Sequence, residues 1–261
     1  MDKNIVAGMG EIGMPIQKLL SKKSNTIGYD IDKTLMDKQA FKKFENSNTK
    51  FLHVCIPFTK SFSANVKKLI KKFDPEIVVI HSTISPSTTS KLQSKTKTPI
   101  IYSATRGVHK RMSNDLKRYT KFFAVSEHTP KKEFTIKEFK KEMKIHGIKT
   151  KQMSTSETLE LGKIICDTSY LGWLINYAQL SNVIAGQYNV DYDEMWTFSD
   201  EIHKFLGNRP KMYPGFIGGH CVIPNLDLIH NETLNLIKKM NTSYDKKIKN
   251  AKSINKKYLK K

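Results

Sequence analysis

The stretch NIVAGMGEIGMPIQKLL, residues 4–20, decides the fold class of this chain of 261 residues. It opens with a short apolar run of the kind that forms a buried strand. From Ile12 onward its apolar residues recur at the spacing of one face of a helix. Gly8, Gly10 and Gly13 stand between the two and fit the pattern G-x-G-x-x-G. The stretch therefore predicts a strand, a tight glycine turn and a helix.

This arrangement is typical of a dinucleotide site. Gly8 permits the tight turn, Gly10 lets the backbone approach a pyrophosphate, and Gly13 lets the helix pack closely on the strand. The amide groups and partial positive charge of the first helical turn favour phosphates. Asp30 ends the next strand candidate, where a carboxylate binds a ribose 2′-hydroxyl and repels a 2′-phosphate. The pattern predicts NAD rather than NADP; the alternative is a turn that binds nothing.

The rest of the first half alternates strand and helix patterns. The segments 25–31, 51–57, 76–83, 100–103, 122–125 and 146–153 have the composition of strands. Helical periodicity appears in 61–73 and 128–143. Such alternation indicates a mostly parallel sheet covered by helices on both faces.

The second half has helical patterns only. The segment Ser154–Gly186 contains no proline, Ser154 and Glu157 have the spacing of a capping box, and Lys163 and Asp167 lie four residues apart. Two more helices are expected over 191–206 and 226–240. After residue 164 apolar residues point almost all round the long helix, which predicts burial against other helices or in a homodimer.

These patterns predict an α/β fold of the Rossmann type: a doubly wound, mostly parallel sheet followed by an all-helical domain. Residues 1–153 are assigned to NAD binding and 154–242 to substrate binding and dimerisation. Residues 243–261 are expected to form a basic tail.

Charge restricts the class of partner. The chain carries 45 Lys plus Arg against 24 Asp plus Glu, a formal net charge of +21. This excess favours an anionic small molecule, such as a sugar phosphate or nucleotide sugar. Aromatic residues are not interleaved with the basic ones near the C-terminus, so a nucleic-acid partner is not expected.

The cysteines and the apolar runs restrict the compartment. Cys55, Cys166 and Cys221 are odd in number and widely spaced, which favours neither disulfides nor a metal site. No secretion leader and no apolar run of membrane-spanning length is visible. A reducing cytoplasm is therefore expected, without membrane attachment.

Four further segments complete a family pattern. They are HVCIPFT (53–59), HSTISPSTT (81–89), ETLELGKIICDTSY (157–170) and PGFIGGHCVIPN (214–225). Together with the glycine turn, and in this order, they resemble the UDP-glucose/GDP-mannose dehydrogenase family within the 6-phosphogluconate dehydrogenase-like superfamily. Members of the family oxidise a nucleotide-sugar alcohol to a uronic acid with two NAD molecules.

The resemblance implies roles for individual residues. Cys221 would be the nucleophile that attacks the aldehyde formed by the first oxidation. Lys163 would stabilise the oxyanion, and Thr83 would help to hold the catalytic water. Asp167 and Asn225 occupy the remaining two catalytic positions. The other implied contacts are Ile56, Pro57, Ser82 and Thr83 for NAD, and Arg106, His109, Gly218, Gly219 and His220 for the substrate.

The chain also departs from the family pattern. Asp167 stands where the family has Asn, and Asn225 stands where it has Asp. The segment around Arg106 and His109 lacks the family's two glutamates, and the sequence shows no counterpart of its C-terminal nucleotide-binding domain. Two alternatives therefore stay open. One is a single-step hydroxyacid or sugar-acid dehydrogenase of the 6-phosphogluconate/β-hydroxyacid type, with no covalent step at Cys221. The other is a non-catalytic NAD-binding protein.

Overall fold

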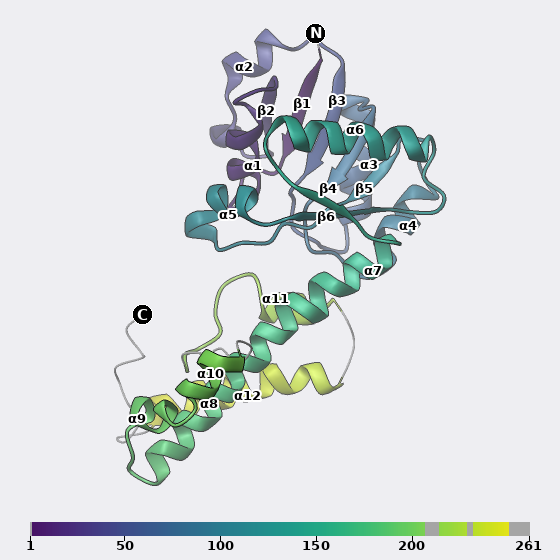
Figure 1. Ribbon diagram of the computed structural model, residues 1–261. Helices are drawn as coiled ribbons and strands as arrows, with labels where there is room; N and C mark the ends of the chain where they lie inside the picture. The colour runs from purple at the N-terminus through teal and green to yellow at the C-terminus, as the bar shows by residue number, and fades with distance from the viewer. Residues whose placement is uncertain (1, 207–213, 229–231, 251–261) are drawn as a thin grey trace. The chain divides into compact units, whose positions relative to one another are not determined.

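The computed structural model describes residues 2–206, 214–228 and 232–250. The chain divides into two compact units, Met1–Lys163 and Ile164–Lys261 (Figure 1). The assignment of NAD binding to 1–153 and of substrate binding and dimerisation to 154–242 stays a prediction, since it concerns ligands and a partner chain.

The first unit is built on a seven-stranded sheet with the order β2-β1-β3-β4-β5-β6-β7. Strands β1 to β5 are parallel, β6 runs antiparallel to β5, and β7 is parallel to β6. The strands are β1 (Lys3–Ala7), β2 (Thr26–Tyr29), β3 (Thr49–Val54), β4 (Ile77–Ile80), β5 (Ile100–Tyr102), β6 (Lys121–Val125) and β7 (Thr150–Gln152).

Helices cover both faces of this sheet. One face is covered by α1 (Gly13–Leu20), α5 (Met112–Arg118) and α6 (Lys132–Ile145), the last crossing in front of the strands in Figure 1. The other face is covered by α2 (Lys38–Lys43), α3 (Phe62–Phe73), α4 (Thr88–Gln93) and α7 (Ser156–Leu161).

The alternation of side chains explains the two layers. Along β3, Phe51 and His53 point to the α1 face, while Leu52 and Val54 point to the α3 face. All four are fully buried. A strand buried on both faces reads as a nearly continuous apolar run, as expected for a parallel sheet between helices. The predicted fold class, a Rossmann-type sheet followed by helices, is confirmed.

The second unit is helical in its described part. The predicted helix from residue 154 begins with α7 of the first unit and continues through a π-helical segment, Gly162–Ser169, into α8 (Tyr170–Gln187). The helix expected over 191–206 is broken into α9 (Tyr192–Thr197) and α10 (Asp200–Leu206). The remaining helices are α11 (Ile223–Leu226) and α12 (Glu232–Asn250).

Two local predictions differ from the structure. Thr155 rather than Ser154 caps α7, because its hydroxyl accepts a 3.1 Å hydrogen bond from the amide of Thr158. Helix α12 continues to Asn250, into the segment expected to be a tail, and residues 251–261 of that segment lie outside the described residues.

In the part of the chain that the structure describes, we find no helix with both the length and the apolar character needed to cross a bilayer.

Candidate functional site

The glycine turn after β1 has the geometry that the sequence predicts. Gly8 adopts φ +93°, and a Cβ atom there would lie 2.8 Å from the carbonyl carbon and oxygen of Cys55. A Cβ on Gly13 would lie 1.7 Å from the carbonyl oxygen of Gly8. Only glycine fits at these two positions, because the backbone after β3 packs against Gly8, which has a positive φ, and α1 packs against the turn at Gly13.

Gly10 differs from its two neighbours in the motif. A Cβ atom there would meet no other heavy atom within 4 Å. The first turn of α1 contains no acidic residue, and no side chain in the described part of the chain caps it. Gly10 therefore borders open space in front of a helix N-terminus, which is the arrangement that accommodates a phosphate. The predicted neighbours Glu11 and Ile12 lie in the same turn; Glu11 is exposed and Ile12 packs on the core.

Asp30 lies at the end of β2, beside the glycine turn. Its carboxylate accepts hydrogen bonds from the backbone amides of Met9, at 2.6 Å, and Asp32, at 3.0 Å. The residue is half-buried. An ionised carboxylate has about four acceptor positions, so two bonds leave capacity for a ribose hydroxyl.

The ends of β3 and β4 complete this edge of the sheet. The Ser82 hydroxyl donates a 2.6 Å hydrogen bond to the carbonyl of Ile56, which ties the two strand ends together. Ile56, Ser82 and Thr83 are half-buried and Pro57 is exposed. Because β1, β2, β3 and β4 are parallel neighbours, the structure brings all the predicted cofactor residues to one carboxyl edge of the sheet.

The loop after β5 carries the predicted substrate residues of this unit. Arg106 donates a 2.7 Å hydrogen bond to the carbonyl of Thr120, and its guanidinium lies 4.8 Å from the centre of the Phe122 ring. The guanidinium is thus held against β6. His109 begins a short 3₁₀ turn, and its side chain lies outside what the structure describes.

Sequence reasoning missed a buried carboxylate that joins helix α7 to the start of α4. Glu160 in α7 is fully buried and accepts hydrogen bonds from the amides of Ser87, at 2.6 Å, and Thr89, at 2.9 Å. The Thr89 hydroxyl donates a third bond, at 2.6 Å. Ser87 has φ +64°, a strained conformation for a residue with a side chain. Glu160 thus fixes the turn that follows Thr83. The sequence signal was a glutamate three residues before Lys163.

Lys163 and Asp167 both lie in the π-helical segment Gly162–Ser169. The π-helix repeats at i→i+5, so the spacing of four does not place the two side chains as it would on an α-helix. Lys163 is half-buried and Asp167 is exposed, although the sequence suggested a buried helix here. Single π-helical turns inside α-helices are frequent at functional sites.

A buried polar cluster lies under the sheet edge, on the α1 face. The Nδ1 atom of His53 and the Nε2 atom of His81 are 2.9 Å apart, and Lys121 donates a 3.0 Å hydrogen bond to the carbonyl of Ser103. Burial lowers the pKa of His53 to about 3 and the pKa of Lys121 to about 7. A cavity of about 10 Å³ borders both histidines and Lys121. Such a cavity holds one water molecule at most.

The three cysteines have different environments. Burial raises the pKa of the Cys55 thiol to about 12, which makes Cys55 a poor nucleophile at neutral pH. Cys166 and Cys221 are both exposed. Exposure therefore permits a covalent role for Cys221, whereas the raised pKa argues against one for Cys55.

In the second unit, Gly218, Gly219, His220 and Cys221 form an exposed arch between the buried residues Ile217 and Val222. Gly219 adopts φ +73°, which a residue with a side chain rarely adopts. Asn225 is half-buried in α11, directly after the arch. Apart from Asp167, the predicted residues of this unit therefore lie on one short segment.

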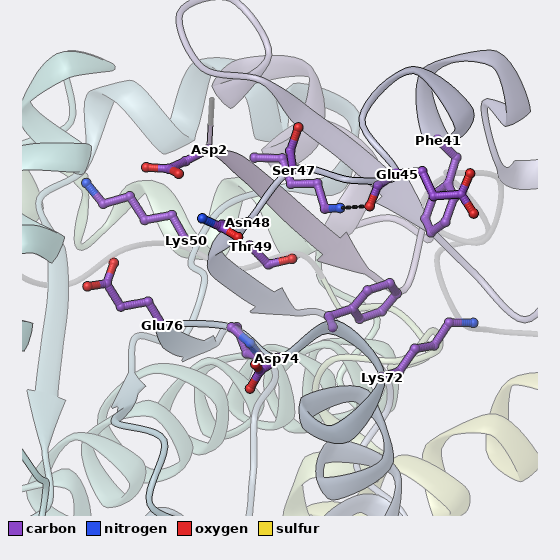
Figure 2. Close-up of a pocket in the computed structure, with 13 residues that line it drawn as sticks. Asp2, Phe41, Glu45, Ser47, Asn48, Thr49, Lys50, Lys72, Asp74 and Glu76 are labelled. Carbon is purple, nitrogen blue, oxygen red and sulfur yellow. Dashed lines mark hydrogen bonds between the residues drawn. The ribbon is translucent and has the colours of Figure 1, made fainter.

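A hollow of about 790 Å³ lies at the opposite, amino edge of the sheet, as Figure 2 shows. Its lysines already have partners. Lys3 donates to the carbonyls of Phe44 and Glu45, and Lys50 forms a 2.7 Å ion pair with Glu138. Ligands of open α/β sheets bind at the carboxyl edge, so we do not place the functional site in this hollow.

Comparison with known proteins shows the fold. No protein-family model and no curated protein sequence matches the chain. Among solved structures, the chain is similar to UDP-D-ManNAc dehydrogenase from Pyrococcus horikoshii, with a TM-score of 0.75 and 16% identity over 93% of this chain and 68% of that one. It is also similar to UDP-N-acetyl-mannosamine dehydrogenase Cap5O from Staphylococcus aureus. The TM-score is 0.69 and the identity is 15% over 94% of this chain and 69% of that one. A third similar structure is 3-hydroxyisobutyrate dehydrogenase from Mycobacterium tuberculosis. Its TM-score is 0.65 and its identity is 13% over 98% of this chain and 96% of that one. At these identities the likeness concerns the fold.

Proposed function

We propose that this protein is an NAD-dependent dehydrogenase that oxidises the CH–OH group of a sugar or nucleotide sugar. The observation that carries the proposal is the glycine turn. Gly8 and Gly13 are sterically obligatory, whereas Gly10 borders open space beside the Asp30 carboxylate. A turn that served only to join strand and helix would not need that open space.

The residues present fit a dinucleotide. The turn Gly8–Gly13 and the first amides of α1 would hold the pyrophosphate, with Glu11 and Ile12 beside it. Asp30 would bind the ribose hydroxyls and disfavour a 2′-phosphate, which selects NAD. Ile56, Pro57, Ser82 and Thr83 would line the nicotinamide end. Bound NAD would supply a hydride acceptor.

The chain itself would supply the remaining chemistry. Lys163 would stabilise negative charge on the substrate oxygen. The Cys221 thiolate would add to the carbonyl carbon of the aldehyde product, giving a thiohemiacetal that a second oxidation converts to a thioester. Thr83 would help to place the water that hydrolyses the thioester, and Asp167 and Asn225 would occupy the two remaining catalytic positions.

The substrate would be an anionic sugar derivative. Arg106 and His109 follow β5 at the carboxyl edge, and the net charge of +21 favours an anion. Gly218 and Gly219 would let the backbone approach the sugar closely, and His220 would contact it. Two of the similar structures are UDP-sugar dehydrogenases, which supports a nucleotide sugar.

The likeness to 3-hydroxyisobutyrate dehydrogenase over 98% of the chain favours a second candidate, a single oxidation of a hydroxyacid. In that reaction Lys163 would act as the acid or base, and Cys221 would not form a covalent bond.

The proposed assembly is a cytoplasmic homodimer that associates through the Ser154–Gly186 region.

The decisive test is NADH formation by the purified chain with nucleotide sugars, sugar phosphates and hydroxyacids. Two NADH per substrate would support the two-step reaction, and Cys221→Ser would then stop after the first. One NADH per substrate, unaffected by Cys221→Ser, would support the single-step candidate. Lys163→Ala should slow every oxidation. Absence of both turnover and calorimetric NAD binding would contradict the proposal.

A further inference from the structure

Buried amide side chains on helices α8 and α12 hold the segment that leads into the arch Gly218–Cys221. Gln179 on α8 donates a 2.6 Å hydrogen bond to the carbonyl of Gly215 and a 3.2 Å bond to the Oδ1 atom of Asn241 on α12. Gln179 is 1% exposed and Asn241 is 4% exposed. The two amides therefore form a connected pair between the helices and the segment before the arch.

Asn241 binds both polar backbone groups of one residue. The amide of Ile217 donates a 2.8 Å hydrogen bond to the Oδ1 atom of Asn241, and the Nδ2 atom donates a 3.1 Å bond to the carbonyl of Ile217. This is the pairing that a neighbouring strand would provide. A side chain that satisfies both groups fixes the position and the rotation of that peptide.

The other end of the arch is held by apolar contacts. Val222 belongs to a buried cluster with Ile217, Leu226, Leu234 and Ile237. A Cβ on Gly172 of α8 would lie 3.1 Å from side-chain atoms of Val222 and Ile237, which shows how closely the helices pack there. Between these two anchors only the four residues Gly218–Cys221 are exposed.

Two glycines in this arch would leave the thiol loosely placed without such anchors, since glycine permits many backbone conformations. Buried amides are also costly in a helix interface unless they are hydrogen-bonded. Here the hydrogen bonds go to backbone groups of Gly215 and Ile217. We therefore attribute the two buried amides to the fixing of the segment directly before the arch.

We infer that Gln179 and Asn241 are positioning residues that hold the Gly218–Cys221 arch so that the Cys221 thiol is presented in one orientation. This inference rests on the proposed function, because it concerns the proposed nucleophile. Neither residue belongs to the sequence motifs that point to the site.

The test compares Asn241→Leu and Gln179→Met with the control Asn182→Leu. Asn182 is a buried amide on α8, as Gln179 is, but its 2.9 Å hydrogen bond goes to the Tyr244 hydroxyl and not to a backbone group of residues 215–221. The Tyr244 hydroxyl donates a 3.3 Å bond to the carbonyl of Pro214, and we expect the control to retain this bond. Gln179→Met preserves volume, so it reports on the same anchor if Asn241→Leu does not fold.

We expect the two anchor variants to lower kcat of NAD reduction by roughly 10- to 100-fold, the cost of a small misplacement of a reacting group. KM for NAD should not change, and Asn182→Leu should keep kcat. The rate of Cys221 alkylation by iodoacetamide should change relative to Cys166 in the anchor variants only.

Wild-type kinetics in both anchor variants, or equal losses in the anchor variants and the control, would overturn the inference. If the wild-type chain reduces no NAD, kcat cannot be compared among the variants and the alkylation profile decides alone. A change of the Cys221 profile in the anchor variants but not in Asn182→Leu then supports the anchor. No difference among the variants overturns it.

Discussion

The backbone amide of Met9 donates a 2.6 Å hydrogen bond to the carboxylate of Asp30. One bond thus joins the turn proposed to hold the phosphates to the residue proposed to hold the ribose. Asp30 is therefore positioned before any ligand arrives, which reduces the ordering cost of binding. The same bond means that substitutions at Asp30 affect the turn as well as the ribose contact.

The first prediction separates binding from folding within the glycine turn. Gly10→Ala should leave the thermal midpoint unchanged, because the methyl group meets no atom of the chain within 4 Å. It should weaken NAD binding roughly tenfold or more, since about 1–3 kcal/mol is lost when a phosphate loses its backbone partners. Calorimetric titration measures the affinity.

Gly13→Ala is the matched variant. Its methyl group would lie 1.7 Å from the carbonyl oxygen of Gly8, so the free energy of unfolding should fall by at least about 1–3 kcal/mol. Equal stability of the two variants, or unchanged NAD affinity in Gly10→Ala, would contradict the proposed ligand position.

The second prediction concerns the choice between the two dinucleotides. Asp30→Ala removes the negative charge that repels a 2′-phosphate, and it also removes the bond from Met9. NAD affinity should fall, and the ratio of NADP to NAD affinity should rise. Asp32→Ala is the control, because Asp32 is an exposed carboxylate close to Asp30 in the chain. A rise of the ratio in both variants would indicate a general charge effect instead.

The fold of the first unit followed from the sequence because its strands are short apolar runs that alternate with amphipathic helices. Helices α1 and α3 lie within the predicted segments, and strand β1 begins one residue before its own. The short helices α2, α4 and α5 had no clear period over six or seven residues. The reversal of β6 was not visible, because strand direction depends on tertiary pairing and leaves no mark in the composition.

The site was predictable where a steric requirement fixes residue type, as at Gly8 and Gly13. It was not predictable where a polar side chain serves backbone groups far away in the sequence. Glu160 bonds to residues more than 70 positions earlier, and Asn241 to Ile217. Local patterns cannot report such pairs. The polar residues Asn176, Gln179 and Asn182, three apart on an otherwise apolar helix, were the available signal.

The third prediction is a loss of stability in mild acid that originates at His53. Burial lowers the pKa of His53 to about 3 in the folded chain, from 6.5 when exposed. Glu142 opposes this shift, whereas Lys121 and His146 add to it. Between these two pKa values the unfolded state binds more protons. The free energy of unfolding should therefore fall as the pH drops below 6.5 toward 3.

In His53→Phe this slope should be smaller by up to about 1.4 kcal/mol per pH unit, the value for one proton. Urea unfolding at several pH values measures it. His128→Gln, at an exposed position, should retain the wild-type slope. Two other groups act in the same direction. Burial lowers the pKa of His81, and hydrogen bonds to His146, Ser24 and Asn4 lower the pKa of Glu142 to about 2. Some acid sensitivity should therefore persist in His53→Phe.

The fourth prediction concerns assembly. Tyr177, Leu180, Ile184 and Tyr188 follow one another at helical spacing and are each between 42% and 78% exposed. Such an apolar stripe is costly in water unless another surface covers it. Light scattering should give a mass near twice the 30.0 kDa of one chain. Leu180→Arg combined with Ile184→Arg should give the monomer.

Phe134→Arg, at an exposed position of α6, is the control and should leave the dimer intact. A wild-type mass near 30.0 kDa at micromolar concentration would rule out the dimer.

The last prediction is that Lys163 and Cys221 act in one site. A lysine beside a thiol lowers the pKa of that thiol and increases the fraction of reactive thiolate. Cys221 and Cys166 are both exposed, so accessibility alone predicts similar alkylation by iodoacetamide. A shared site instead predicts faster labelling of Cys221, with protection by NAD plus substrate. Cys55, whose pKa burial raises to about 12, should react most slowly.

Lys163→Met should bring the rate at Cys221 down to that at Cys166, whereas Lys91→Met, at an exposed position of α4, should have no effect. The comparison is internal to each protein sample, so differences in stability or concentration cancel. Faster labelling of Cys221 that persists in Lys163→Met would assign the activation to the arch itself. Equal labelling of Cys221 and Cys166 in the wild-type chain would leave Cys221 without a nucleophilic role. The single-step reaction would then be the better account of this site.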